Sequence, residues 1–249
     1  MRKEWIFGRM AFCIALLLFL LSPLAMAMDI VYDGRLGDGY GKVLSMEEGL
    51  SSFHVRKNSS YVLEIMNQDD VAAVETYDFQ ARSLMTNRIM PLYWYPHYTV
   101  TMVLAVADGI PYEVKDWKDL TVYPLTVGIP VDTVTRDLSM MSFSYGLSGE
   151  MDLSAGVEAL KKIHQEGRLR LDARYAPGYY LQNSRREEAD VYIVPDVEAR
   201  RWVWEGRPFH LVYPERGTLS FKKGLLSREP LLLNEKQIES RLWQEGYSQ

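Results

Sequence analysis

Strand-like and helix-like segments alternate along residues 28–249, and this alternation is the strongest constraint on the fold. The apolar run TVTMVLAV (99–106) is rich in β-branched residues and predicts a mostly buried strand. The segment SAGVEALKKIHQEG (154–167) instead has one apolar stripe at helical spacing and ends at Gly167. Strands separated by helices favour a mostly parallel sheet with helices on its faces. The expected fold class is α/β, with too many strands for one small sheet.

The remaining segments follow the same alternation. Apolar runs and turn residues predict strands over residues 29–34, 53–57, 70–75, 99–106, 123–130, 169–176, 189–196 and 209–215. Helical spacing predicts helices over residues 39–52, 61–68, 79–89, 133–145, 154–167, 198–206 and 234–246. The stretch between the last predicted strand and the last predicted helix is interpreted as a turn.

Residues 1–27 have the anatomy of a secretory signal peptide. A basic start precedes the apolar run 10–21, and Ser22-Pro23 then leads to small residues at a cleavage site after Ala27. The alternative is an uncleaved membrane anchor, but the apolar run is short for a membrane span. We therefore expect a periplasmic or secreted protein whose signal peptide is cleaved after Ala27.

Cys13 is the single cysteine and leaves with the signal peptide, so the mature chain has no thiol. This excludes disulfides, thiolate metal sites and a cysteine nucleophile. Residues 1–27 hold three of the 28 Lys and Arg and one of the 33 Asp and Glu, so 25 basic minus 32 acidic residues leave a formal charge of −7. No basic patch favours nucleic acid as a partner. The mild acidity leans toward a cationic ligand, although it is more typical of a solvated surface.

Three stretches together resemble one protein family. MPLYWYPHYTVTMVLAV (90–106) leads into IPYEVKDWKDL (110–120), which stands where that family often has a Pro-x-x-Trp-x-Asp-Leu segment. ADVYIVP (189–195) resembles its second-lobe strand, and YPERGTLS (213–220) resembles its return segment. The order is similar to bacterial extracellular solute-binding proteins of ABC importers, which are type II periplasmic-binding-protein-like, family 1. The chain departs from the family in a short first lobe.

The resemblance implies a two-lobed periplasmic-binding-protein-like fold, in which each lobe is a mostly parallel sheet flanked by helices. Hinge strands would join lobe 1 (28–98 and 215–249) to lobe 2 (99–214), with a ligand cleft between them. The implied function is capture of a small solute and its delivery to an ABC transporter permease, without catalysis. We expect a monomer that needs no cofactor and no metal.

Residues 110–120 then form the edge of lobe 2. Asp116 is a candidate N-cap for a short helical turn beginning at Trp117, and Asp119 is a weak capping-box partner. Trp117 is expected to fill the core beside the hinge.

Polar residues follow several predicted strands, at the sheet edge where open α/β proteins bind ligands. Tyr77 and Asp78 follow the strand at 70–75, Asp132 and Thr133 lie at the corresponding place in lobe 2, and Asp196 ends a further strand. Asp78 can bind a cation or cap a helix, and capping is the structural alternative for each of these polar residues. We interpret all five as candidate ligand-binding residues.

Aromatic residues supply the other candidates. In YWYPHY (93–98) the residues expected to face the cleft are Tyr95 and His97, with packing in the core as the alternative. Tyr175 and Tyr179 flank Pro177-Gly178 in a loop, where exposed aromatic side chains are less easily explained as core.

No catalytic or metal-binding pattern emerges. The four histidines show no ligand spacing, and GLSGE (146–150) lacks the last glycine and the strand–turn–helix context of a hydrolase motif. A sugar, a polyamine, a thiamine-like ring or iron held by carboxylates and tyrosines remains open as the solute. The alternative function is a secreted sensory or accessory protein that uses the same fold to bind a partner or signal molecule.

Overall fold

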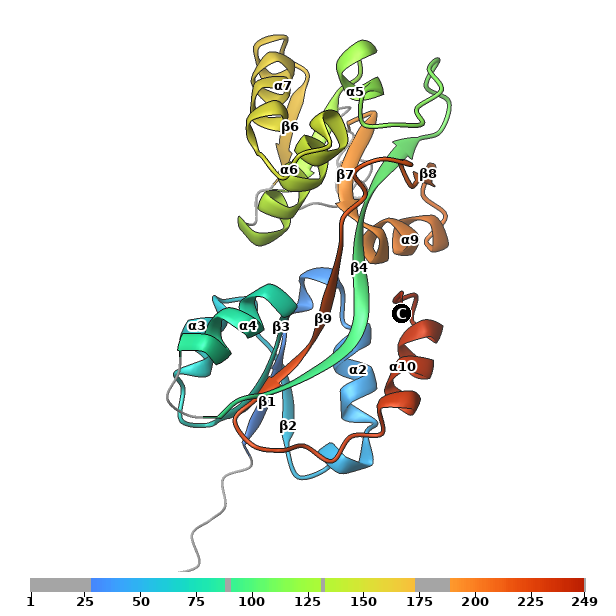
Figure 1. The fold of residues 1–249 in the computed structure, drawn as a ribbon. Helices are drawn as coiled ribbons and strands as arrows, with labels where there is room; N and C mark the ends of the chain where they lie inside the picture. Colours follow the sequence, from blue (N-terminus) through green and yellow to red (C-terminus); the bar gives the residue numbers. More distant parts are fainter. Residues whose placement is uncertain (1–27, 88–90, 131–132, 173–188, 249) are drawn as a thin grey trace, which may run out of the picture.

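The computed structural model describes residues 28–87, 91–130, 133–172 and 189–248. They form two lobes linked by long strands (Figure 1). The strands are β1 (Asp29–Tyr32), β2 (His54–Lys57), β3 (Val71–Tyr77), β4 (Tyr93–Ala107), β5 (Val127–Pro130), β6 (Leu169–Asp172), β7 (Val191–Pro195), β8 (Phe209–Val212) and β9 (Ser220–Ser227).

The helices cover the sheets, and none of those described is long and apolar enough to cross a bilayer. The α-helices are α2 (Gly39–Ser45), α3 (Val62–Met66), α4 (Asp78–Asn87), α5 (Asp119–Val122), α6 (Thr133–Ser148), α7 (Ser154–Gln165), α9 (Asp196–Trp204) and α10 (Glu235–Gln244). Two short 3-10 helices, η1 (Gly34–Leu36) and η2 (Glu48–Leu50), lie in lobe 1.

The strand order is β2-β1-β3-β9-β4-β7-β5-β6, with β8 paired to β4. In lobe 1, β1 is parallel to β2 and β3, and β9 is antiparallel to β3 and β4. In lobe 2, β5 is parallel to β6 and β7, whereas β4 is antiparallel to β7 and β8. The α/β fold class and its two-lobed architecture are confirmed.

Strand β4 passes from one lobe into the other. Its part from Tyr93 to Thr101 pairs with β9, and its part from Met102 onward pairs with β7. The chain comes back beside it, because the Met102 N–H donates to the Leu219 carbonyl at 3.0 Å just before β9 begins. Figure 1 shows β4 and β9 side by side as the connection between the lobes.

Strand β9 is the element that the sequence pattern does not predict, because Lys222, Lys223 and Gly224 interrupt its apolar run. Lys222 is exposed, but the Lys223 side chain is buried among acidic groups. Gly224 is required for close packing, since a Cβ there would lie 2.0 Å from the Tyr95 carbonyl oxygen. A buried charged residue and a glycine therefore remove the apolar pattern by which a strand is recognised in the sequence.

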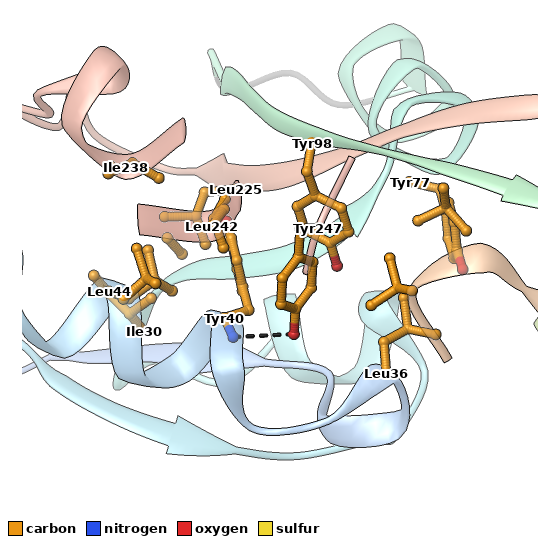
Figure 2. Close-up of a cluster of buried hydrophobic side chains, with 14 of the residues drawn as sticks. Ile30, Leu36, Tyr40, Leu44, Tyr77, Tyr98, Leu225, Ile238, Leu242 and Tyr247 are labelled. Atoms are coloured by element: carbon orange, nitrogen blue, oxygen red, sulfur yellow. Dashed lines mark hydrogen bonds between the residues drawn. The ribbon is translucent and has the colours of Figure 1, made fainter. Parts of the chain in front are cut away.

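Apolar side chains fill the faces of the lobe 1 sheet, and one cluster joins α2 and α10 to the sheet (Figure 2). Four buried tyrosines, Tyr40, Tyr77, Tyr98 and Tyr247, lie in this cluster. The Tyr40 N–H donates to the Tyr247 hydroxyl at 3.1 Å, and the Tyr247 ring packs edge-on against Tyr98, with centroids 4.7 Å apart. Residues near the C-terminus thus complete the core of the lobe that contains the first strand.

The core of lobe 2 is built around Trp117. Its side chain is fully buried, and its ring centroid lies 6.2 Å from that of Phe143. A Cβ at Gly146 would lie 2.0 Å from the Trp117 ring, so the glycine lets α6 approach closely. The expectation that Trp117 fills the core is confirmed.

The turn before α5 is held by carboxylates. Asp119 accepts hydrogen bonds from the N–H groups of Lys115 and Asp116 at 2.7 and 2.9 Å, and Asp116 accepts from the Trp117 N–H at 2.7 Å. The predicted contact of Asp119 with the Asp116 N–H is present, but α5 starts at Asp119 and its N-cap is Lys118, so the prediction of Asp116 as the N-cap is wrong.

A candidate ligand cleft

A cavity of about 240 Å³ lies where the two lobes meet. Its described lining comes from the turn after β1, the turn after β2, the start of α4 after β3 and the start of α6 after β5: Arg35, Ser59, Ser60, Tyr61, Val62, Gln80 and Val134. Val134 belongs to lobe 2 and the other residues to lobe 1. In Figure 1, α3 and α4 lie on the side of lobe 1 that faces α6. The cavity therefore lies at the carboxyl ends of strands from both lobes, as in other open α/β sheets.

Arg35 is placed by the short helix η1. Asp33 caps this helix, because its Oδ1 accepts from the Arg35 N–H at 3.2 Å. The same oxygen accepts from the Arg35 Nε at 2.8 Å, which fixes the guanidinium beside the cavity. Gly37 ends η1 with φ at 101°, a conformation that a side chain disfavours.

The two serines lie in the turn that follows β2. The Asn58 N–H donates to the Tyr32 carbonyl at 3.0 Å, and the Asn58 side-chain oxygen accepts from the Ser60 N–H at 2.9 Å. This side-chain-to-backbone bond is a local turn device. It holds Ser59 and Ser60 at the cavity wall.

Gln80 reaches the cavity from the first turn of α4. Its side-chain oxygen accepts from the Thr76 hydroxyl at 2.8 Å and from the Tyr77 N–H at 3.4 Å. A backbone N–H can only donate, so the amide oxygen must be the end that faces it. The amide NH2 of Gln80 is then the end offered to the cavity.

A smaller space adjoins the cavity and shares Arg35, Ser60 and Gln80 with its wall. A buried ion cluster of Asp33, Glu75 and Lys223 lines this smaller space. Lys223 Nζ lies 3.2 Å from Asp33 Oδ2 and 3.4 Å from Glu75 Oε1. Glu75 also accepts from the Asp33 N–H at 2.6 Å and from the Tyr98 hydroxyl. Each carboxylate is thus engaged by donors of the protein itself.

The pKa values of this cluster reflect burial opposed by neighbouring charge. Burial alone raises the pKa of Asp33, but Lys223 and Arg35 outweigh it and hold that pKa well below its ordinary value of 3.8. Burial lowers the pKa of Lys223, but Asp33 and Glu75 outweigh it and raise that pKa above 10.5. For Glu75 burial dominates and raises the pKa above 4.5, although Lys223 opposes it.

Among the described sequence candidates, only Tyr77 lines the smaller space that adjoins the cavity. Its ring centre lies 5.0 Å from Lys223 Nζ, and it stacks on Phe79 with centroids 5.5 Å apart. Burial raises the pKa of Tyr77 to about 12, so its hydroxyl is neutral at pH 7. Its neighbour Asp78 begins α4 and binds the Arg82 guanidinium at 2.6 Å.

Tyr95 and His97 lie in the lobe 1 core rather than in the cavity wall. The Tyr95 hydroxyl accepts from the Leu231 N–H at 2.8 Å, and the His97 Nδ1 lies 2.6 Å from the Tyr40 hydroxyl. Burial lowers the pKa of His97 to about 4. Both side chains therefore make their described contacts within the protein.

Asp196 begins α9 next to the crossing of β4. Its carboxylate accepts from the Thr101 N–H at 3.0 Å and from the Ser248 hydroxyl at 2.6 Å, and it lies 3.2 Å from the Arg200 guanidinium. Asp196 thereby ties lobe 2 to the point where the chain crosses between lobes and to the C-terminal segment.

The other candidates are only partly described. Thr133 is the first residue of α6, whereas Asp132, Tyr175 and Tyr179 lie outside the described residues. Within the described ranges, no group of three or more His, Cys, Asp and Glu side chains is arranged to hold a metal ion.

The cavity-lining residues Arg35, Ser59, Ser60 and Gln80 are not among the sequence candidates. The turn Asn58-Ser59-Ser60 does follow a predicted strand, so its position could have suggested a ligand site. Helix capping explains the same residue types equally well. Arg35 and Gln80 carry no local signal that separates them from surface residues.

Comparisons with solved structures place this fold among two-lobed binding proteins. The sulfate-binding protein SubI from Mycobacterium tuberculosis superposes with a TM-score of 0.61 at 15% identity, covering 89% of this chain and 85% of that one. The spermidine/putrescine ABC transporter substrate-binding protein PotD from Streptococcus pneumoniae gives a TM-score of 0.54 at 8% identity, with 88% and 78% covered.

The regulatory domain of HypT from Salmonella typhimurium gives a TM-score of 0.52 at 9% identity, with 88% and 96% covered. No protein-family model matches the sequence, and no curated protein matches it either. The chain therefore has the two-lobed fold of the periplasmic solute-binding proteins of ABC transporters.

Proposed function

We propose that this protein is an extracytoplasmic solute-binding protein that captures a small solute between its lobes and delivers it to an ABC transporter permease. Residues 28–98 and 215–249 form lobe 1 in this proposal, and residues 99–214 form lobe 2. The observation that carries it is the cavity to which Arg35 and Gln80 of lobe 1 and Val134 of lobe 2 all contribute. A solute there touches both lobes, so its binding energy favours the closed arrangement.

The remaining assignments follow from this role. The protein acts as a monomer without catalysis, in the periplasm or outside the cell, after cleavage behind Ala27. The resemblance in 110–120, 189–195 and 213–220 supports the type II class and family 1 in particular. N-terminal sequencing of the exported protein tests the cleavage site.

Thermal unfolding of the mature protein against a solute panel tests the binding role. The panel contains sugars, polyamines, thiamine, amino acids, inorganic oxyanions, small carboxylates and ferric ion. A solute at about a hundred times its dissociation constant adds about 2.7 kcal/mol, which raises the melting temperature by several degrees.

Two tryptophan variants locate the binding. Ser60→Trp fills the cavity and should abolish the shift, whereas Ser52→Trp, at another exposed serine of lobe 1, should leave it intact. If the rise in melting temperature persists in Ser60→Trp, the solute binds elsewhere and the assignment of the cleft as its site is wrong.

A second candidate is a secreted sensory or accessory protein that binds a partner or signal molecule. The likeness to a regulatory domain favours it, because the same fold there serves regulation. A flat response to the whole panel by a folded protein, with a histidine kinase or cyclase gene beside its own, would favour this role over transport.

A further inference from the structure

The cleft combines donor groups and a cation in a molecule whose overall charge is negative. From this we infer that the solute is a small anion, a carboxylate or an inorganic oxyanion, bound against Arg35, Gln80 and the turn serines. This inference rests on the proposed binding function and names the ligand class of that same site. It reverses the leaning toward a cation that the net charge of the chain suggests.

The first support is the composition of the wall. Among the described residues that line the 240 Å³ cavity, Arg35 is a cation and none is a carboxylate. Gln80 offers its NH2 because its oxygen is bound by the Tyr77 N–H and the Thr76 hydroxyl. Hydroxyls of Ser59 and Ser60 can donate as well as accept. Such a donor-rich set matches a ligand that consists of acceptors.

The second support is the state of the nearby carboxylates. Asp33 accepts from Arg35 at 2.8 Å and from Lys223 at 3.2 Å, and Glu75 accepts from the Asp33 N–H at 2.6 Å. A cationic solute would have to displace these protein donors to reach either carboxylate. It would also approach the two cations, Arg35 and Lys223, that neutralise them.

The third support is charge balance and size. Among the described groups, the cations Arg35 and Lys223 face the carboxylates of Asp33 and Glu75, so these four groups carry no net negative charge. They do not provide the negative potential that a polyamine needs. A cavity of about 240 Å³ is also smaller than a drug-sized site of roughly 300–1,000 Å³. It suits an anion of few atoms.

Isothermal titration tests the inference with three probe classes: sulfate, phosphate and a series from acetate to citrate as anions; putrescine and spermidine as cations; glucose and maltose as neutral solutes. Saturable binding of a member of the anion class only is the expected result. Sulfate or phosphate binding without carboxylate binding identifies an oxyanion site, and the reverse identifies an organic acid site.

Variants connect the binding to the cavity. Arg35→Gln removes a charge-assisted hydrogen bond worth about 1.5–3 kcal/mol and should weaken anion binding by about 10- to 100-fold. Arg82→Gln changes the net charge equally, on α4 outside the described cavity wall, and should change the affinity less than twofold. Gln80→Glu keeps the acceptor for the Tyr77 N–H but replaces the donor NH2, and should abolish anion binding in a folded protein.

The outcomes separate the inference from the proposed function. Saturable binding of only a polyamine or a sugar overturns the anion class while the binding role stands. Anion binding that Arg35→Gln, Gln80→Glu and Arg82→Gln affect equally also overturns it. No binding by any of these probes, together with binding of another solute from the wider thermal-unfolding panel, overturns the anion class alone. No binding in either panel removes both proposals.

Discussion

Replacing Lys223 by methionine should be among the most damaging single changes in lobe 1. The substitution keeps the length of the side chain but leaves Asp33 and Glu75 without the ammonium that lies 3.2 and 3.4 Å from their oxygens. Removing one partner of a buried ion pair costs about 3–5 kcal/mol, because the other charge stays buried. At about 2–4 °C per kcal/mol for a chain of this size, the melting temperature should fall by about 6–20 °C.

The pH dependence gives this prediction a sign. Because the pKa of Lys223 is raised, its contribution to the free energy of unfolding is complete below pH 10.5 and is lost as the pH rises through its pKa in the folded protein. The lowered pKa of Asp33 means that its contribution is present above pH 3.8 and is lost as the pH falls through the folded-state value. Asp33 and Lys223 therefore contribute stability throughout the pH range between these values, whereas the raised pKa of Glu75 makes its contribution full below pH 4.5 and lost as the pH rises through its folded-state value.

In Lys223→Met the carboxylates lose their cation, so their pKa values rise and they protonate more readily. The stability difference from the wild type should be largest near pH 8 and smaller near pH 5. Urea denaturation at both pH values measures it. Lys222→Met is the matched control, since Lys222 is the exposed neighbour on the same strand. A loss below about 1 kcal/mol, or one equal to that of the control, would refute the reasoning.

Three further outcomes are expected in urea denaturation. Burial lowers the pKa of His97 from 6.5 to about 4. Its contribution to the free energy of unfolding is therefore full above pH 6.5 and falls by about 3 kcal/mol as the pH drops toward 4. His97→Asn should remove this part of the acid sensitivity, and an unchanged pH profile of stability would contradict the prediction. Gly224→Ala places a Cβ 2.0 Å from a backbone carbonyl oxygen and should lower the free energy of unfolding by more than about 3 kcal/mol. Gly109→Ala, with open space around it and φ at 82°, should lower it by about 1–2 kcal/mol. Equal losses in the two variants would count against the packing argument. Ser248→Ala removes a 2.6 Å hydrogen bond to Asp196 and should cost about 1.5–3 kcal/mol, and a neutral effect would show that the C-terminal tie is not stabilising.

The order of elements could be predicted because each segment carries its own periodicity. The apolar run of β4 and the stripe of α7 are examples in which local pattern and burial agree. Strand β9 could not be predicted, since Lys223 is buried through charges supplied by β3 and the turn after β1. No pattern within β9 contains that information.

The candidate cleft was only partly predictable for the same reason. Positions after strand ends identified Tyr77, which lines the smaller space that adjoins the cavity. The aromatic residue Tyr95 was attractive as a ligand platform, yet its hydroxyl serves the Leu231 N–H inside lobe 1. Arg35 and Gln80 are brought to one cavity only when four segments that are separate in the sequence meet, which is a property of the tertiary structure.

The tyrosine contact between Tyr40 and Tyr247 also has a consequence for the order in which the protein assembles. Lobe 2 is drawn from one continuous stretch between the two passages of the chain, so its contacts are comparatively local and can form early. Lobe 1 needs β9, α10 and Tyr247, which are synthesised after the elements of lobe 2. Contacts of such large sequence separation form slowly. The half that carries Arg35 should therefore mature last, and a nascent chain would hold a finished lobe 2 before its cleft exists.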